Sequence, residues 1–567
     1  MNIIKSNYYK NNSMNSLSTS WIVIVGILIS VLHLDLFYYS HDTPKWLIYD
    51  LATSLFIFFS LSHKNLIQYS VPGLLALMLI YLMIISLWWA PHKVAGLEFL
   101  FRFINGVLLI HFLLKKYDTA ALTELFLNTV FYSAMAFSLV FITERYIFEI
   151  PFNVGTFSPI GFINNTSAVF NIWIPGLVIF AIVNYQNKLK FYGAALTLIV
   201  IVGVLMEAGT RGAILGLTIS ELIVFLIVLK KNPRQAVVFL TITALLILGV
   251  GIYNVSDALQ NGRLDAKLTV MKNNIGAAGE GRVNMIKNTW EMTKDNPFGV
   301  GVNNFEYVHP KYAKVGTSDK SPFVNENQIL RTPHNVIVKI LSELGFIGGI
   351  LFVLLLSYIY LAALIGAFKG SFVDKWLFVG LSATLLHSMV SAVILTPVSF
   401  SFFILLTAVV LSRIELVPGR WNVKFNIRVP QFVTSGYLII ILLSFSTVVS
   451  EYYSFKGRSQ FDGGYLEEAL KFNPQNDRAL LNLAQYYFYR DKNVGKSLEN
   501  IDQFLELYPY HIAGLMMKAE RHYQLDDLEK SNNVLDKLLE FYPGYTKANR
   551  LKQLVSVKLA RKNRNYN

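Results

Sequence analysis

The chain has 567 residues, of which 54% are hydrophobic and only 15% are charged, whereas about a quarter of the residues of an average soluble protein are charged. Apolar runs of roughly twenty residues, the length that crosses a bilayer as a helix, recur along it, and none alternates like a strand of an outer-membrane barrel. The absence of cysteine excludes disulfides, cysteine zinc sites and thiol catalysis. The composition therefore predicts an all-α, polytopic membrane protein.

Twelve or thirteen apolar segments are expected to span the membrane after a polar tail of residues 1–19. No cleavage site of small residues follows the first apolar run, so we interpret it as a retained helix and not as a signal peptide. The predicted spans are residues 20–39, 46–62, 70–90, 96–114, 123–143, 166–184, 191–208, 212–229, 235–253, 346–367, 373–393, 395–412 and 433–450.

Positive charge predicts the orientation of these helices, because loops rich in Lys and Arg stay in the cytoplasm. With the N-terminus inside, the cytoplasmic connections carry much of the excess of 50 Lys and Arg over 36 Asp and Glu, so no role in nucleic-acid binding is expected. The predicted parts are a cytoplasmic tail (1–19), spans one to nine (20–253), an extracytoplasmic catalytic loop (254–333), spans ten to thirteen (334–450) and an extracytoplasmic domain (451–567).

The C-terminal domain is polar, has helical periodicity and contains a repeat. The tripeptides at 472–474, 507–509 and 541–543 end in proline and are spaced by 35 and 34 residues. This period, with proline ending the second helix, resembles tetratricopeptide repeats, which usually bind a partner; a generic domain of helical hairpins is the alternative. Residues 547–567 carry seven basic and no acidic residues, which suits contact with anionic headgroups or a solvated last helix.

Arg211 lies in the sequence GluAlaGlyThrArgGlyAla at 207–213, at the predicted outer end of a span. A charge beside a spanning helix is costly and is therefore a functional candidate, although an arginine can also extend to the interface with a purely structural role. The glycines on either side of ThrArg favour the functional interpretation, because they let a large ligand approach the backbone.

His334 follows the dipeptide ThrPro at 332–333, which predicts an N-cap and the first residue of a helix at Pro333. His334 would then lie in the first turn, where the positive end of the helix favours anions and a neutral imidazole that can act as a base. Alternatively, His334 only completes a helix end at the water interface. A polar stripe with a spacing of four residues follows it and comprises Asn335, Lys339 and Glu343.

Arg282 begins a predicted amphipathic helix that carries Trp290, and a turn with Gly299 and Gly301 follows. The two glycines make no dinucleotide fingerprint, since the third glycine and the strand–helix unit are missing, but the turn can let backbone approach a ligand. By itself Arg282 is more typical of a solvated helix residue than of a site. No Walker, HisGluXxxXxxHis or GlyXxxSerXxxGly motif occurs, so no metal or cofactor is expected.

The order of these pieces resembles the superfamily of O-antigen ligases and Wzy-type polysaccharide polymerases. ThrArgGly ends a span, a long outer loop follows with GlyArg, a Trp and ProXxxGlyXxxGly, and HisAsn precedes GluLeuGlyPheIleGly at 343–348. The resemblance covers residues 60–415. It implies a membrane glycosyltransferase that moves a sugar chain from a polyprenyl (undecaprenyl) diphosphate to a hydroxyl acceptor at the outer face of the bacterial cytoplasmic membrane, in cell-surface polysaccharide biosynthesis.

The resemblance also implies a catalytic set of Arg211, Arg282 and His334. The two arginines would hold the diphosphate without a metal, and His334 would take the proton of the acceptor, so that direct displacement inverts the anomeric centre. A role of His334 as a charge partner of the diphosphate is the alternative. The residues expected to bind substrate are Arg211, Arg282, Asn335, Arg331, Trp290, Gly299 and Gly301.

The expected partners are the lipid-linked glycan donor, a glycan, lipid or protein acceptor, membrane lipids, and a protein bound by the repeats. Ligases, polymerases and protein O-oligosaccharyltransferases share the motifs, so these subtypes stay open. A glycolipid flippase would need charged residues along a path across the bilayer. A scaffold would explain the repeats but neither Arg211 nor His334. The sequence therefore favours the transferase.

Overall fold

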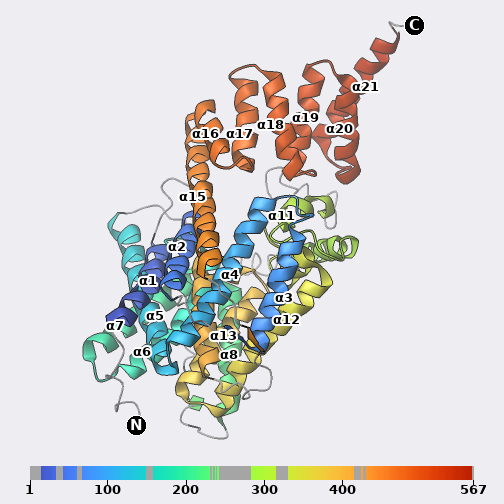
Figure 1. The fold of residues 1–567 in the computed structure, drawn as a ribbon. Coiled ribbons are helices and arrows are strands. Elements are labelled where there is room, and N and C mark those ends of the chain that lie inside the picture. Colours follow the sequence, from blue (N-terminus) through green and yellow to red (C-terminus); the bar gives the residue numbers. More distant parts are fainter. Residues whose placement is uncertain are drawn as a thin grey trace, which may run out of the picture.

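The computed structural model describes residues 14–32, 42–60, 67–148, 157–229, a few positions between 233 and 241, and residues 282–313, 330–413, 423–425 and 430–564. In these residues seven helices are long and apolar enough to cross a membrane. Figure 1 shows a bundle of long helices with an array of short helices at one end, and the two chain termini at opposite ends of the molecule. The predicted all-α membrane fold is confirmed.

Twelve of the thirteen predicted spans coincide with a long helix. The ninth, 235–253, lies largely outside the described residues, as do residues 254–281 of the predicted loop. The helices of the bundle are α1 (Met14–Val31), α2 (Asp42–Ser60), α3 (Val71–Ser86), α4 (Lys93–Lys116), α5 (Thr119–Ile142), α6 (Ile163–Val183), α7 (Lys188–Ala208), α8 (Arg211–Leu229), α12 (Val336–Lys369), α13 (Phe372–Ser388), α14 (Pro397–Ser412) and α15 (Pro430–Gln460).

Side-chain caps explain where several of these helices begin. The Asp118 carboxylate accepts a hydrogen bond from the Ala121 N–H at 2.9 Å and begins α5, and Asn187 caps α7 in the same way. At the end of α7, Gly209 adopts a left-handed conformation with φ +59°, which a glycine does without steric cost. The chain thus turns sharply between α7 and α8, directly before Arg211.

Aromatic residues on α6 and α13 form the centre of the bundle. The rings of Trp173 and Trp376 are fully buried, and Trp173 packs edge-on against Phe402 of α14 with ring centroids 5.5 Å apart. Small residues let the surrounding helices come close: a Cβ added to Gly216 of α8 would lie 2.6 Å from the Ala383 carbonyl oxygen of α13. This close approach fixes α8 against α13.

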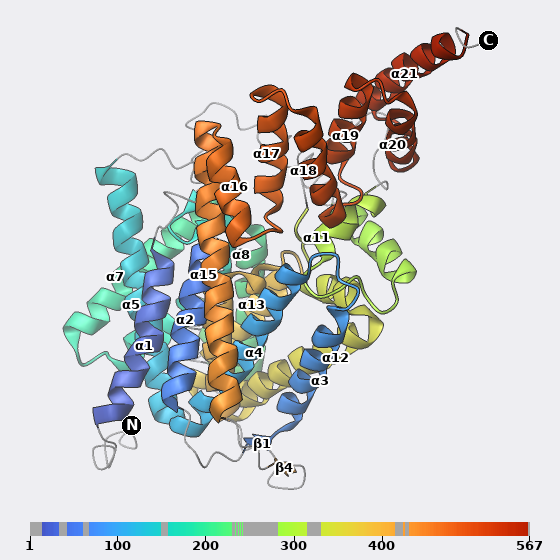
Figure 2. The same ribbon diagram turned by 45° about the horizontal axis from the view of Figure 1, so that its top comes forward.

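Two small antiparallel sheets join loops of the bundle. β1 (Ile67–Tyr69) pairs with β4 (Val423–Phe425), and β2 (Phe157–Ser158) pairs with β3 (Gly161–Phe162). The turn of the second hairpin is held by the buried ammonium group of Lys45, which donates hydrogen bonds to the carbonyl oxygens of Pro159 and Ile160. β1 and β4 lie at the end of the bundle opposite the array of short helices (Figure 2).

The loop before α12 inserts its backbone into a break in that helix. Gly345 has φ +70° and ψ −173°, which interrupts α12 between residues 336–344 and 346–369. The N–H groups of Val300 and Gly301 donate to the carbonyl oxygens of Ser342 and Glu343, each at 3.0 Å, and the Phe346 N–H donates to Pro297. The predicted span 346–367 thus corresponds to the second part of α12. The first part, residues 336–344, precedes this span and is bonded to the loop.

Charged residues inside the bundle hold α15 against α2 and α4. Arg102 lies 3.2 Å from the Glu98 carboxylate and 3.8 Å from that of Asp50. From α15, Ser444 donates to Asp50 and Thr447 donates to Glu98, both at 2.6 Å. The sequence analysis did not single out these charges. They pair with one another and thereby anchor α15.

The C-terminal array consists of short helices that pack in sequence order. α17, α19 and α21 begin 35 and 34 residues apart, and the prolines at 474, 509 and 543 follow the ends of α16, α18 and α20 by two residues, as the predicted period requires. The tetratricopeptide assignment itself stays a prediction. The helices are α16 (Gly463–Phe472), α17 (Asp477–Tyr489), α18 (Val494–Leu507), α19 (Ile512–Gln524), α20 (Leu528–Phe541) and α21 (Thr546–Arg564).

Two expectations about this C-terminal region need adjustment. The boundary predicted at 451 falls inside α15, which continues without a break to Gln460 and packs against α16. In the basic last helix, Lys552 pairs with Asp536, while Lys558 and Lys562 approach Asp526 at 3.9 and 3.7 Å. These ion pairs favour a solvated last helix over contact with headgroups.

The array contacts the loop that precedes α12. The rings of Tyr307 and Tyr508 lie 4.5 Å apart, and the Tyr542 hydroxyl donates to the Pro310 carbonyl oxygen. Tyr307 belongs to α11 (Phe305–Val308), which is followed by the short 3₁₀ helix η2 (His309–Tyr312). Loop and array therefore lie at one end of the bundle, as the odd number of predicted spans requires, while the membrane face to which that end belongs stays a prediction.

Replacing Gly345 by Ala should destabilise the protein by at least about 2 kcal/mol, because a Cβ there meets the Pro297 carbonyl oxygen in a conformation that only glycine adopts easily. Thermal unfolding in detergent measures the effect. Gly203→Ala is the matched control, since a Cβ at this position in α7 meets no atom within 4 Å. Equal melting temperatures of the two variants would contradict the proposed role of the break.

Candidate functional site

Three segments far apart in the sequence meet at the C-terminal end of α13. The first turn of α8 packs there, since a Cβ on Gly212 would lie 2.7 Å from the His387 ring and 2.8 Å from Val390. Gly212 directly follows Arg211, so the close packing of α8 on α13 brings this arginine to the same end. The Arg211 side chain is exposed.

The turn that carries His334 differs from the prediction. The expected helix start at Pro333 is wrong, because α12 begins three residues later, at Val336. Asn335 is the actual N-cap, and its side-chain oxygen accepts from the Val338 N–H at 3.0 Å. His334 precedes the helix with φ +55°, a left-handed conformation that is uncommon for residues other than glycine and is concentrated at functional sites.

Asn335 ties this turn to α13. Its Nδ2 donates to the Met389 carbonyl oxygen at 2.9 Å, two residues after His387. Both ends of the Asn335 amide are thus engaged in protein contacts, and the residue positions His334. The His334 N–H in turn donates to Thr332 Oγ1 at 2.9 Å, which holds the left-handed turn in place.

Arg282 lies on a helical segment that the structure describes from residue 282 to residue 295, and it interacts electrostatically with the rings of both His334 and His387. Burial, and then the positive charge of Arg282, lower the pKa of His334 below its usual 6.5. The imidazole of His334 is therefore neutral near pH 7 and can accept a proton. The three residues predicted to be catalytic thus converge on one end of α13.

His387 and Asn171 belong to the same cluster, although the sequence analysis did not select them. Asn171 of α6 donates to the Ala383 carbonyl oxygen, and its Nδ2 lies 3.4 Å from His387 Nδ1. Both side chains are almost fully buried. A histidine inside an apolar span was the available signal, since ionisable residues within spans are functional candidates by default.

The polar stripe of α12 anchors the loop. Lys339 forms a buried ion pair with Glu343, and Glu343 also accepts a hydrogen bond from the Phe305 N–H at 3.3 Å. Neither side chain is exposed enough to meet a large substrate, so their effect on the site is through the position of the loop. By contrast, in the part of the chain that the structure describes, neither Arg211 nor Arg282 has a carboxylate within ion-pair distance.

The remaining residues predicted to bind substrate lie at the loop. Gly299 and Gly301 have φ +83° and +104°, and their missing side chains make room for protein backbone: the Glu343 carbonyl for Gly299 and Ala90 for Gly301. Trp290 is 46% exposed and packs edge-on against Phe346. Arg331 lies near Glu306, with 3.7 Å between Nε and Oε2, and lines a polar cavity below the array of short helices.

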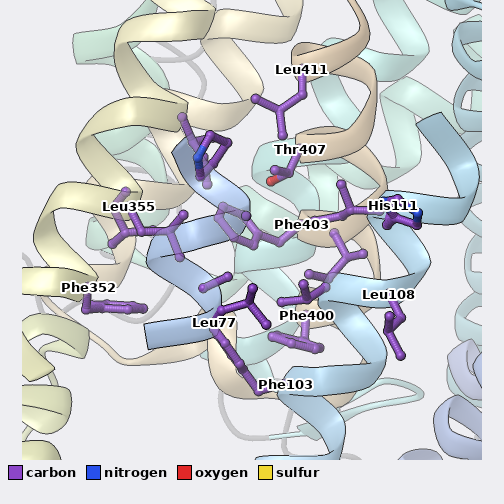
Figure 3. A pocket seen from close by; sticks show the side chains of 18 of the residues that line it. Leu77, Phe103, Leu108, His111, Phe352, Leu355, Phe400, Phe403, Thr407 and Leu411 are labelled. Carbon is purple, nitrogen blue, oxygen red and sulfur yellow. The ribbon is translucent and has the colours of Figure 1, made fainter. Parts of the chain in front are cut away.

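An apolar cavity of about 260 Å³ lies among α3, α4, α12 and α14. Figure 3 shows the rings of Phe103, Phe352, Phe400 and Phe403 among the side chains that line it. Ile340, near the start of α12, also lines it. One wall of the cavity is thus formed by α12, the helix that follows His334, and the other walls are formed by helices of the bundle.

Residues 195–353 match the family described as O-Antigen ligase, a range that includes Arg211, Arg282 and His334. No curated protein matches the chain. Among the described residues, no group of three histidine or acidic side chains is arranged to hold a metal ion.

Replacing Arg282 by Gln should raise the pKa of His334, because the substitution removes a positive charge that disfavours the imidazolium. The titration of His334 is followed by NMR of the full chain with labelled histidine. Arg331→Gln is the control and should leave this titration unchanged, since Arg331 is not among the groups that shift it. An unchanged pKa of His334 in the Arg282 variant would contradict the placement of Arg282 beside His334.

Proposed function

Residues 195–353 make the chain a member of the O-antigen ligase superfamily, and on this premise we propose that it transfers a sugar chain from a polyprenyl diphosphate to a hydroxyl group of an acceptor. The family implies a lipid-linked glycan donor and an acceptor in general. The proposal includes three further points: the carrier is undecaprenyl diphosphate, the reaction takes place at the outer face of the cytoplasmic membrane, and it inverts the anomeric centre.

The observation that carries the proposal is the convergence of Arg211, Arg282 and His334 on the end of α13. Two guanidinium groups without carboxylate partners among the described residues suit a diphosphate, whose oxygens match the planar fork of arginine. The neutral imidazole of His334 suits a base. A site with two cations and one base fits the departure of a diphosphate, whose negative charge increases by one when it takes the electron pair of the glycosyl bond.

In the proposed reaction the acceptor hydroxyl oxygen attacks the anomeric carbon of the donor. The bond between this carbon and the diphosphate oxygen breaks, and its electron pair stays with the diphosphate, which Arg211 and Arg282 neutralise. The proton of the hydroxyl passes to the His334 imidazole. A single displacement of this kind inverts the configuration at the anomeric carbon.

The apolar cavity supports a lipid-linked donor. A polyprenyl tail needs a hydrocarbon environment, and an apolar cavity within the bundle can replace the lipid around part of the tail. The cavity is lined mainly by aliphatic and aromatic side chains, of which Ile340 lies six residues after His334 in the chain. In the proposal the tail lies between α3, α4, α12 and α14, and the diphosphate lies at the end of α13.

Replacing His334 by Ala should lower transfer by at least about 100-fold, because general-base catalysis contributes about 10²–10⁴. Arg282→Ala should be similarly impaired, whereas Lys287→Ala, an exposed cation on the same helix, should retain activity. The measurement is transfer from a purified lipid-linked glycan by protein in lipid nanodiscs. A fully active His334→Ala variant would contradict the proposal, whether His334 acts as the general base or as a charge partner of the diphosphate.

The accumulated lipid-linked glycans of a gene deletion distinguish the subtypes. Complementation with wild type should restore the normal pattern, and complementation with His334→Ala should not. If single repeat units accumulate, the protein is a polymerase; if long lipid-linked chains accumulate while their acceptor stays bare, it is a ligase. Unchanged glycans in the deletion would contradict a transferase function for the glycans analysed.

A further inference from the structure

A polar cavity of about 700 Å³ lies between the array of short helices and the rest of the protein. We call it the interdomain chamber. Its walls come from the start of α4, from α11 and Arg331, from the upper part of α15, and from α17 to α19. The volume is within the range of about 300–1,000 Å³ that is usual for ligand sites. The chamber is distinct from the cluster at the end of α13, because the two share no lining residue.

The walls of the chamber are almost neutral overall. They carry four carboxylates and three guanidinium groups, and the lining histidines His92 and His511 have pKa values lowered by burial, for His511 to about 4, and so add no charge near pH 7. The seven charged residues are Glu98, Glu306, Glu451, Asp477, Arg331, Arg458 and Arg478. A diphosphate or other polyanion would find no excess of positive charge here.

Amides and aromatic rings complete the lining. Six Asn and Gln residues line the chamber: Asn303, Asn473, Gln475, Asn476, Asn482 and Gln485. The first four bond to other protein groups. Asn482 and Gln485 form no hydrogen bond within the described part of the chain and offer both donors and acceptors. His92, Tyr307, Tyr508 and Phe504 form a continuous series of rings with neighbouring centroids 4.8, 4.5 and 5.2 Å apart. These rings are almost fully buried and pack on one another, which makes this wall rigid. Amides and carboxylates suit a ligand with many hydroxyl groups.

The chamber is joined to the catalytic cluster by a short stretch of chain. Arg331 lines the chamber, and His334 lies three residues further on. On the other wall, Glu306 lines the chamber while the preceding residue, Phe305, bonds to Glu343 in α12. A ligand held in the chamber therefore lies beside the segment that carries His334.

We propose that the interdomain chamber binds the saccharide of the acceptor, with the hydroxyl groups of the sugar on the amides and carboxylates. This rests on the proposed transferase function and adds to it the place and class of the acceptor. The array of short helices then forms one wall of the substrate site. The donor carries the diphosphate and binds separately at the end of α13.

Asn482→Trp tests the proposal, because it places a large ring in the chamber from α17. The probe is the oligosaccharide repeat unit released from the producing bacterium's own surface polysaccharide, and its binding to the full chain in nanodiscs is measured by saturation-transfer NMR. We expect binding to weaken by at least about tenfold, the factor that one lost buried hydrogen bond can give. Gln485→Ala, which removes an amide without adding bulk, should weaken it in the same direction.

Gln503→Trp is the matched control, because Gln503 is exposed on the neighbouring helix α18 and does not line the chamber. It should bind the oligosaccharide like the wild type. Inorganic pyrophosphate serves as a second probe: it should bind all three variants normally, and it should bind poorly to the Arg211→Ala, Arg282→Ala double variant. Normal pyrophosphate binding also shows that a chamber variant is folded.

Equal oligosaccharide binding by wild type, Asn482→Trp and Gln485→Ala would overturn the chamber proposal. Retention of glycan binding together with the loss of a co-purifying protein would also overturn it, since the chamber wall would then recognise a polypeptide. These outcomes leave the transferase proposal intact if His334→Ala is inactive in transfer. An active His334→Ala variant would instead remove the transferase proposal, whatever binds in the chamber.

Discussion

The insertion of the loop backbone into the break of α12 at Gly345 is the constraint on which the rest of the site depends. Hydrogen bonds from Val300 and Gly301 join the loop to the first part of the helix, and this part follows directly on His334. The same loop carries Tyr307, which contacts the C-terminal array. Because the contacts are backbone to backbone, they are insensitive to side-chain identity except at the glycines, where no Cβ fits. The contact between the loop and α12 therefore positions both the turn that carries His334 and one wall of the chamber.

The helices of the bundle were predictable because a bilayer demands long apolar segments, and local signals set several of their ends. The predicted span 191–208 and the observed α7, which begins at Lys188, differ only because Asn187 caps the helix three residues earlier. The start of α12 was predicted wrongly, since Thr332 and Pro333 resemble a cap, but the side chain of Asn335 captures the Val338 N–H instead. Two caps competed within four residues, and sequence alone does not rank them.

The candidate site was predictable where a residue stood out locally, and not where it depended on a distant partner. Arg211 and His334 stood out beside glycines or a proline. His387 carried only the general signal of an ionisable residue in an apolar run, and its contact with Asn171, 216 residues away, could not be predicted from the sequence. The charges of Asp50 and Arg102 were also overlooked, because their pairing requires α2 and α4 to be neighbours. The chamber depends on contacts between the C-terminal array and the loop before α12, so no single stretch of sequence encodes it.

The helix α15 runs without a break from the bundle into the array. The number of residues in this helix therefore sets the direction in which the array faces relative to the bundle. Ser444 bonds to α2 at one level, and Ser450, six residues on, bonds to the Ala469 carbonyl oxygen of α16. Each residue of an α-helix turns by about 100°, so inserting or deleting one residue between these two serines would swing the array away from the loop. A loop tolerates such insertions and deletions at little cost. In this helix, each change in length also rotates the array relative to the bundle. During divergence, this stretch should accept substitutions far more readily than changes in length.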